Sequence, residues 1–281
     1  MYLGHYVMFL VLLTLTAWVY SPVFPEYLHV LLDGNNSHGL FVPLISGYFI
    51  WSKRRQLSAI SPETAWGGLA VLITSLFLYY LGEAGKIEFL PRVSLILTIY
   101  GLVLLHFGSR FFRTILFPLG FLFFAVPIPV SVVDRVSFPL KMIATDISAV
   151  ILRLFQIPVY QQGNLLYFAN VSLEVAEACS GIRSMMTYFM LSTLMAFIMQ
   201  TTGIRRLVIV FSAIPLAFLA NLIRVVGTGV LAHFFGGQVA RGFLHEFSGM
   251  VTFLFGLGLI YLVANLLHSD HGEAVRSQGG S

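Results

Sequence analysis

The sequence predicts an all-α polytopic membrane protein, and three observations lead to this fold class. Hydrophobic residues make up 58% of the 281 residues and charged residues only 10%, whereas soluble domains carry roughly 25% charged residues. Apolar stretches close to the ~20 residues needed to cross a bilayer recur along the chain. Basic residues are concentrated in short runs between these stretches, as is typical of polytopic inner-membrane proteins. The composition therefore excludes an ordinary soluble domain.

Eight of the apolar stretches are predicted to cross the membrane. Their approximate ranges are Tyr6–Tyr20, Gly39–Trp51, Ala65–Leu81, Val93–Phe107, Thr114–Val126, Ile182–Met199, Leu207–Val230 and Ser248–Leu267. The fifth stretch stops at Pro127, because proline lacks the amide proton that continues a helix. We expect residues 1–268 to form one integral-membrane domain and residues 269–281 to form a disordered cytoplasmic tail.

Two segments between the fifth and sixth stretches are predicted to lie at the membrane surface. Ser131–Phe155 is long enough to cross but carries five charged residues, which favours a short extracytoplasmic amphipathic helix over a ninth span. The segment Val159–Val175 has short β-prone runs on either side of Gly163. This pattern predicts a small extracytoplasmic β-hairpin before the sixth span.

The distribution of basic residues predicts the orientation. With Ser131–Phe155 at the surface, all the basic runs fall on one side, which the positive-inside rule identifies as the cytoplasm. These runs are Lys53–Arg55, Arg110 with Arg113, and Arg205–Arg206. We therefore expect a multi-pass protein of an inner (cytoplasmic) membrane, with the start of the sixth span at the outer face.

Cys179 is the one cysteine of the chain, and it lies in Glu177-Ala178-Cys179-Ser180-Gly181-Ile182-Arg183, where the sixth span is expected to leave the membrane. A lone cysteine cannot form an internal disulfide, so it is either a packing residue or a reactive thiol. Its charged neighbours at the membrane boundary are compatible with a reactive thiol. Local composition leaves both interpretations open.

Arg224 is the only arginine expected deep inside an apolar span, in Asn221-Leu222-Ile223-Arg224. A charge inside the bilayer is costly, so it is a candidate for a functional site. Eighteen residues separate it from Arg206, about 27 Å of helix, which predicts a level close to that of Cys179. Asn221 shares its helix face and could hold the guanidinium. The alternative is an arginine that reaches outward to the lipid headgroups.

His245 precedes Glu246 just before the last span, a pair that resembles the start of a zinc motif. The second histidine of such a motif is missing, since Gly249 stands in its place, so we predict no metal site and no cofactor. Alone, a histidine at this boundary is more often a polar anchor. Close to Cys179 it would instead generate the thiolate. His38 is expected on the same face.

These residues resemble the three motifs of the exosortase/archaeosortase family, which are the Cys179 segment, Asn221-x-x-Arg224 and His245-x-x-x-Gly249. Two upstream blocks are also similar to those of the family: Ser37-His38-Gly39 with Val42-Pro43, and Phe117-Pro118 to Pro127. The resemblance extends over roughly residues 38–267. A histidine at position 245 favours the bacterial branch over the archaeal one, in which arginine is found.

The resemblance implies a membrane transpeptidase or peptidase with Cys179, Arg224 and His245 as its catalytic triad. The implied partners are exported proteins whose C-terminal signal has Pro-Glu-Pro, a transmembrane helix and basic residues, together with an unidentified nucleophilic acceptor and membrane lipids. No nucleic acid is expected. We expect supporting or substrate-binding roles for a further set of residues: Glu177, Ser180, Gly181, Arg183, Asn221 and His38.

Two other functional classes remain open at the level of sequence. A polytopic transporter or flippase would use the buried Arg224 to bind an anionic lipid or sugar. That reading gives no role to Cys179 or His245, and it predicts polar groups near the middle of the bilayer. A non-catalytic scaffold for polysaccharide export is the other alternative.

Overall fold

The computed structural model describes residues 2–32, 36–169, 172–174, 182–200, 202–236 and 243–276. The chain forms two compact units, residues 1–129 and residues 130–281. The sequence alone predicts a single domain over residues 1–268.

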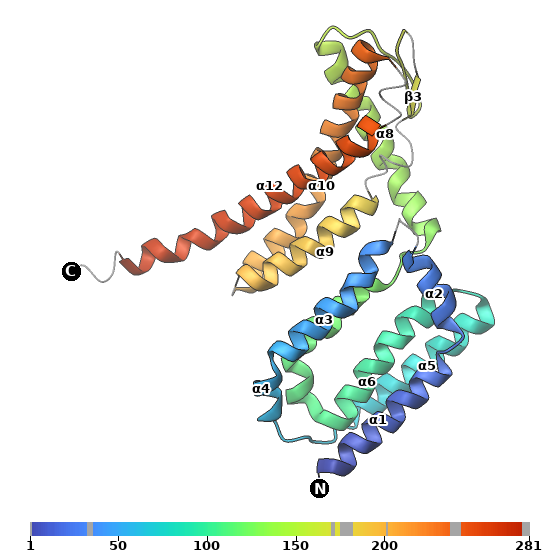
Figure 1. Ribbon diagram of the computed structural model, residues 1–281, viewed down its shortest axis with the longest axis vertical. Helices are drawn as coiled ribbons and strands as arrows, with labels where there is room; N and C mark the ends of the chain where they lie inside the picture. Colours follow the sequence, from blue (N-terminus) through green and yellow to red (C-terminus); the bar gives the residue numbers. More distant parts are fainter. Residues whose placement is uncertain are drawn as a thin grey trace. The chain divides into compact units, whose positions relative to one another are not determined.

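Unit 1 consists of helices (Figure 1). Their bounds are α1 (Tyr2–Val19), α2 (Val23–Leu32), η1 (Ser37–Leu40), α3 (Phe41–Ser52), α4 (Arg54–Ser58), α5 (Gly67–Gly85), α6 (Phe89–Thr114), α7 (Leu116–Phe121) and η2 (Leu122–Ala125). The helices α5 and α6 form a tightly packed hairpin. A side chain at Gly68 would come within 2.7 Å of the Gly101 carbonyl oxygen, so small residues are what allow the two backbones to approach.

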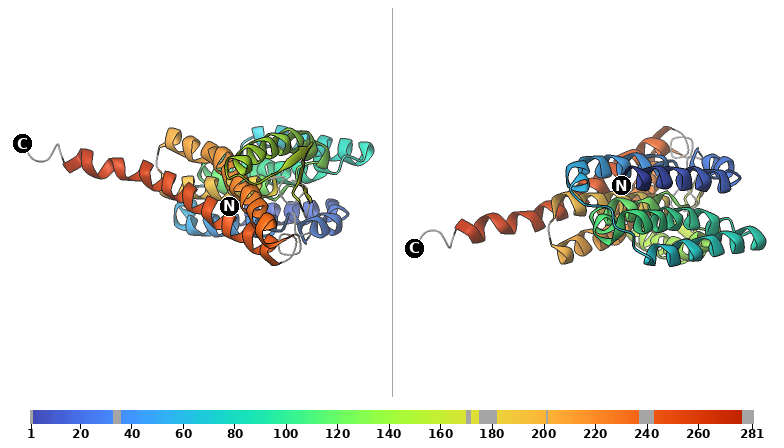
Figure 2. Two further views of the ribbon diagram at one scale, coloured as in Figure 1. Left: turned by 90° about the horizontal axis from the view of Figure 1, so that it is seen from above. Right: turned by 90° about the horizontal axis from the view of Figure 1, so that it is seen from below.

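Unit 2 contains helices and a small sheet. Its elements are α8 (Val130–Leu154), β1 (Tyr160–Gln162), β2 (Leu165–Tyr167), β3 (Ser172–Glu174), α9 (Ile182–Met199), α10 (Gly203–Phe235) and α12 (Phe243–Arg276). The helices α9, α10 and α12 pack against one another as a three-helix bundle (Figure 1). Beyond this bundle, α12 continues as a single extended helix (Figure 2), and so covers part of the segment assigned above to a tail.

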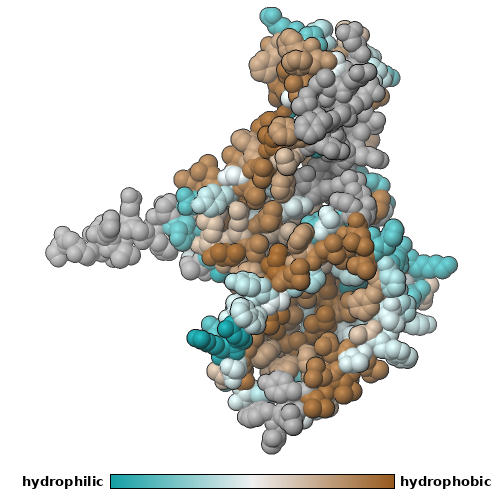
Figure 3. All heavy atoms as spheres, viewed as in Figure 1, coloured by the Kyte–Doolittle hydropathy of each residue, from teal (hydrophilic) through white to brown (hydrophobic). Residues whose placement is uncertain are grey.

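The lengths and apolar surfaces of the helices are those of a membrane protein. Large apolar side chains are exposed along helices of both units (Figure 3), which suits contact with lipid tails rather than water. Among the described residues, four helices are long and apolar enough to cross a membrane, or up to six if two bent helix pairs are each counted as one span. The fold is thus consistent with the predicted all-α polytopic class.

Four of the eight expected spans coincide with the long helices α5, α6, α10 and α12. The others are shorter or bent in the structure. The expected span at Gly39–Trp51 contains the 12-residue α3, only about 18 Å long at 1.5 Å per residue, and the span at Thr114–Val126 contains the shorter α7 and η2. The two helices α1 and α2 meet at an angle of 76°. The number eight therefore stays a prediction.

The amphipathic helix expected at Ser131–Phe155 is α8, and the β structure that follows it differs from a two-stranded hairpin. The strands β1, β2 and β3 form a three-stranded antiparallel sheet in this order. Leu152 of α8, Leu166 of β2 and Phe168 are buried in one apolar core with Val225 and Ala232 of α10. The sheet and α8 therefore cover the C-terminal part of α10.

Candidate active site

The helix α9 runs parallel to α12, and two side-chain hydrogen bonds define their register. The hydroxyl of Tyr188 donates to the carbonyl oxygens of Thr252 and Phe253, at 3.1 and 3.0 Å. Three turns further on, the side-chain amide of Gln200 donates to the Ala264 carbonyl at 2.8 Å. Thr252 follows Tyr188 by 64 residues, and Ala264 follows Gln200 by the same number. Because this offset is constant, α9 and α12 run in the same direction with a fixed register.

The helix α10 runs antiparallel to α12. A guanidinium nitrogen of Arg205, near the start of α10, donates to the carbonyl of Leu267 at 2.8 Å. Nineteen residues later, Arg224 lies against Gly249, which is earlier in α12. The contact is close, since a side chain at Gly249 would place its Cβ 3.2 Å from both Cζ and Nη2 of Arg224. Gly249 thus gives the guanidinium access to the backbone of α12.

The two registers bring three sequence motifs to the same end of the bundle. Extending the 64-residue offset to the start of α9 places Ile182 level with residue 246. Position 245 lies one turn before Gly249 on the same face of α12. Arg224 approaches that face from α10. The start of α9, Arg224 and position 245 are therefore close to one level of the bundle.

The predicted site residues differ in how far the structure describes them. Of the cysteine motif, Glu177, Cys179, Ser180 and Gly181 lie outside the described residues. Cys179 precedes the first residue of α9 by three positions in the sequence.

For two other motif residues the structure describes the backbone only. Arg183 is in the first turn of α9 and His245 is in the first turn of α12. Arg224 and Asn221 of α10 are described completely, and both are partly buried on the same helix face. The structure therefore brings the Arg224 side chain to the elements that carry the other two motifs.

His38 belongs to unit 1 and lies in the 3-10 helix η1. Burial lowers the pKa of its imidazole from the usual histidine value. The adjacent Gly39 is buried, and a Cβ there would come within 2.5 Å of a methyl carbon of Leu31 in α2. Glycine at this position therefore leaves room for the Leu31 side chain.

The far end of the bundle carries a second set of polar contacts. His268 Nδ1 lies 2.9 Å from the Met199 carbonyl oxygen, and Arg206 donates to the Gln200 carbonyl at 2.9 Å. Arg206 and Arg224 are about 27 Å apart along α10 at 1.5 Å per residue. That separation is close to the ~30 Å hydrocarbon thickness of a bilayer. The polar groups therefore gather at the two ends of the bundle.

Comparison with protein families decides the assignment. The model of the transmembrane exosortase family (Exosortase_EpsH) matches residues 30–262, most of the chain. This chain belongs to the transmembrane exosortase family. Neither the comparison with curated proteins nor that with solved structures gave a match. The match spans the sequence positions of all three motifs.

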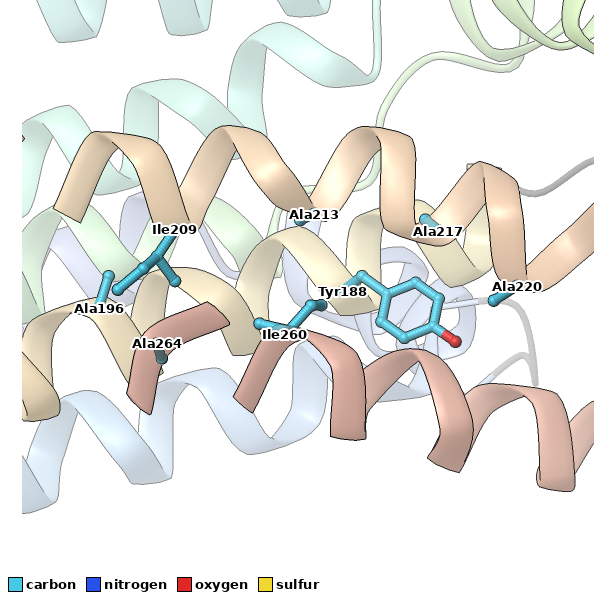
Figure 4. Close-up of a cluster of buried hydrophobic side chains, with 8 residues drawn as sticks. All are labelled: Tyr188, Ala196, Ile209, Ala213, Ala217, Ala220, Ile260 and Ala264. Carbon is cyan, nitrogen blue, oxygen red and sulfur yellow. The ribbon is translucent and has the colours of Figure 1, made fainter. Parts of the chain in front are cut away.

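Arg224 also lies at a boundary between two packing regions along α10. In the region before it in the sequence, Ala213, Ala217 and Ala220 of α10 face Tyr188 of α9 and Ile260 of α12 (Figure 4). In the region after Arg224, α10 packs on α8 and the sheet. Gly229 marks this second region, because a side chain there would lie 3.0 Å from Leu152 and 3.2 Å from Phe168. Arg224 is at the junction of the two.

Three features of this site were missed by reading the sequence. In the sequence Gly249 stands in place of a zinc ligand and ends the third motif, whereas in the structure it is the surface on which Arg224 rests. Tyr188 and Gly256, which tie α9 to α12, were not identified. Their sequence signal is the small-residue spacing Gly249, Gly256, Ala264, which follows one helix face. Among the described residues, no group of three or more His, Cys, Asp or Glu side chains could hold a metal.

Proposed function

We propose that this exosortase is a membrane cysteine transpeptidase or peptidase that cleaves the C-terminal sorting signal of exported proteins. One observation carries the proposal: the start of α9, the Arg224 guanidinium and position 245 lie at one level of a single helix bundle. The family match supports the same class of activity.

In the proposed reaction, Cys179 is the nucleophile. Its sulfur attacks the peptide carbonyl of the signal and forms a tetrahedral oxyanion, after His245 takes the thiol proton. The carbon–nitrogen bond then breaks, a thioester remains on Cys179, and the amine leaves with the proton from His245. An acceptor nucleophile or water resolves the thioester and loses its proton to the same histidine.

Arg224 is proposed to stabilise the thiolate or the oxyanion. A guanidinium offers donors in a fixed planar fork and keeps its charge at any accessible pH. Resting on the bare backbone at Gly249, it has little freedom to move. Such preorganised donors contribute most where water is excluded.

The remaining motif residues are proposed to support these three. Asn221, three residues before Arg224 on the same face, would orient the guanidinium. Ser180 and Gly181 would shape the backbone beside the thiol, while Glu177, Arg183 and His38 would contact the signal. Each of these roles is separable by substitution.

The proposed location is the bacterial inner membrane, with the site at the outer face. Arg205 and Arg206 lie at the opposite end of the bundle from Arg224, and basic residues favour the cytoplasm. An exported protein held by its own transmembrane helix would then present a Pro-Glu-Pro-type signal at the level of Arg224. Basic residues after that helix would stay in the cytoplasm.

Replacement of the one thiol tests the proposal. Cys179→Ala should insert and fold normally, because a small apolar residue replaces another, yet processing of a co-expressed signal-bearing protein should fall below detection. A matched control is Met195→Leu, a neutral change within α9 that should process at the parent rate. Normal processing by Cys179→Ala would end the proposal and favour a transporter or scaffold.

A further inference from the structure

Tyr188 lies across α12 at Gly256 in a close contact of the bundle core. The side chain is almost fully buried, 1% exposed, and its hydroxyl donates to the Thr252 and Phe253 carbonyls. Its ring stacks on Phe253 with centroids 5.1 Å apart. A Cβ at Gly256 would overlap the hydroxyl and come within 2.7 Å of Cζ. Only glycine at this position admits the phenol.

This contact is directional, as is the Gln200–Ala264 hydrogen bond further along α12, but it is the one nearer the start of α9. The alanines and Ile260 packed around it (Figure 4) offer no side-chain hydrogen bond of their own. A hydroxyl held by two consecutive carbonyls in an apolar setting loses its partners if α9 slides along α12, and an unsatisfied hydroxyl is costly there. Tyr188 therefore fixes the axial register of α9 on α12.

The register matters because both helices lead from this contact to the site. Ile182, the first residue of α9, is six residues before Tyr188, about 9 Å of helix. Gly249 is seven residues before Gly256, about 10 Å in the same direction. If α9 slides along α12 at Tyr188, the start of α9 and the cysteine motif that precedes it in the sequence shift by the same amount. Arg224 of α10 does not shift with them, because it packs against α12 at Gly249.

We propose that Tyr188 is a positioning residue for the exosortase reaction, with Gly256 as its receptor on α12. It sets the level of the Cys179 segment against Arg224 and His245 without touching the substrate. This inference rests on the proposed function, since it concerns the alignment of the same three groups.

The test uses disulfide formation, which needs no enzymatic turnover. With Cys179 as the only native thiol, His245→Cys creates a single defined thiol pair. In this background, mild oxidation should form a disulfide between positions 179 and 245. Adding Tyr188→Phe or Gly256→Ala should slow disulfide formation about tenfold or more, because small misalignments have large effects on such reactions. Tyr261→Phe and Gly258→Ala are matched controls, since Tyr261 is exposed and a side chain at Gly258 meets no atom within 4 Å.

A kinetic comparison separates positioning from simple loss of fold. In the enzyme with His245 intact, Tyr188→Phe should lower kcat about tenfold with KM unchanged, while the folded fraction, measured by size-exclusion chromatography in detergent, stays at the parent level. Equal crosslinking and equal kcat in Tyr188→Phe and Tyr261→Phe would overturn the inference. A Cys179→Ala enzyme that still processes would overturn the proposed function instead, and the crosslinking result would remain a test of the register.

Discussion

Two arginines of this exosortase, the buried Arg92 in unit 1 and the partly buried Arg224 in unit 2, occupy different kinds of environment. Arg92 is in the first turn of α6 and its side chain is 6% exposed. One of its terminal nitrogens lies 3.3 Å from carboxylate oxygens of both Glu26 and Glu88. Arg224 instead rests on the backbone of α12 at Gly249. The Arg92 guanidinium is held by two opposite charges. The Arg224 guanidinium instead packs where α12 has a glycine in place of a side chain.

The difference teaches that burial alone does not separate a structural arginine from one proposed to be catalytic. Arg224 is the arginine that the sequence places deep in an apolar span, whereas Arg92 lies in the first turn of α6, at the start of a candidate span. What distinguishes the two is the partner. Two carboxylates lie beside the Arg92 guanidinium, whereas the Arg224 guanidinium packs against the backbone of α12 at Gly249.

Unit 1 also contains a buried network of hydroxyl groups. The Tyr20 hydroxyl lies 3.0 Å from the hydroxyls of both Ser94 and Thr98, and Thr98 donates to Ser75 at 2.9 Å. These side chains join α1, α5 and α6. Such a network stabilises helix packing in an apolar medium, which favours a scaffolding role for this part of unit 1.

The strongest test of the comparison removes each arginine in turn. Arg224→Ala should lower the processing rate roughly 10²–10³-fold, as expected for loss of an oxyanion donor, and Arg224→Lys should restore only part of it, since lysine lacks the planar fork. Arg92→Ala should leave the rate per folded molecule unchanged. Quantitative immunoblotting of substrate and product would measure both.

An equal loss of processing in the two alanine variants would break the comparison. In that case the ion-paired arginine would belong to the catalytic machinery, and burial would be a sufficient criterion after all.

A smaller effect is expected when the surface beneath Arg224 is changed. Gly249→Ala places a methyl group 3.2 Å from the guanidinium, so the arginine must shift by a few tenths of an ångström. Processing should fall about tenfold, because a displacement near 1 Å can cost about 10²-fold. Gly258→Ala, on the same helix with open space around it, is the matched control and should process normally.

The ion pairs of Arg92 are expected to affect stability by a modest amount. Its partners Glu26 and Glu88 are 56% and 64% exposed, so their interaction with Arg92 is screened by solvent. Arg92→Ala should lower the free energy of unfolding by about 1 kcal/mol. Unfolding in mixed detergent micelles would measure it, and a loss as large as that of a fully buried pair, about 3–5 kcal/mol, would show that the site is drier than the structure indicates.

The smallest expected effect is a pH dependence in unit 1. Because burial lowers the pKa of His38 in the folded protein, the unfolded chain binds a proton more readily. The free energy of unfolding should therefore be highest above the ordinary histidine pKa of 6.5 and decrease as the pH falls through the lower folded-state pKa. His38→Gln should flatten this decrease, and an unchanged slope in that variant would locate the titrating group elsewhere.

The sequence predicted those parts of the fold that depend on local composition. Long uninterrupted apolar runs identified α5, α6, α10 and α12, and the mixture of charges and apolar residues identified α8. The three motifs could be assigned to the starts of α9 and α12 and to α10. These features need no knowledge of which helices are neighbours.

The parts that the sequence did not predict depend on tertiary contacts. The partners of Arg92 include Glu26, 66 residues away, and no local pattern connects the two. The helix α3 coincides with the expected stretch Gly39–Trp51, but apolar composition alone does not show whether so short a helix crosses the membrane. Gly249 and Gly256 became meaningful only when Arg224 and Tyr188 were seen to pack against them.

The most direct test of the central claim is to trap the acyl-enzyme. Purified parent enzyme that is mixed with a signal peptide and quenched with acid during turnover should carry an adduct, because the thioester forms before an acceptor or water resolves it. Mass spectrometry should find the acyl part of the peptide on Cys179, and neutral hydroxylamine should release it, as expected for a thioester. Cleavage of the peptide by the parent enzyme without any adduct at Cys179, or with an adduct on another residue, would contradict the account.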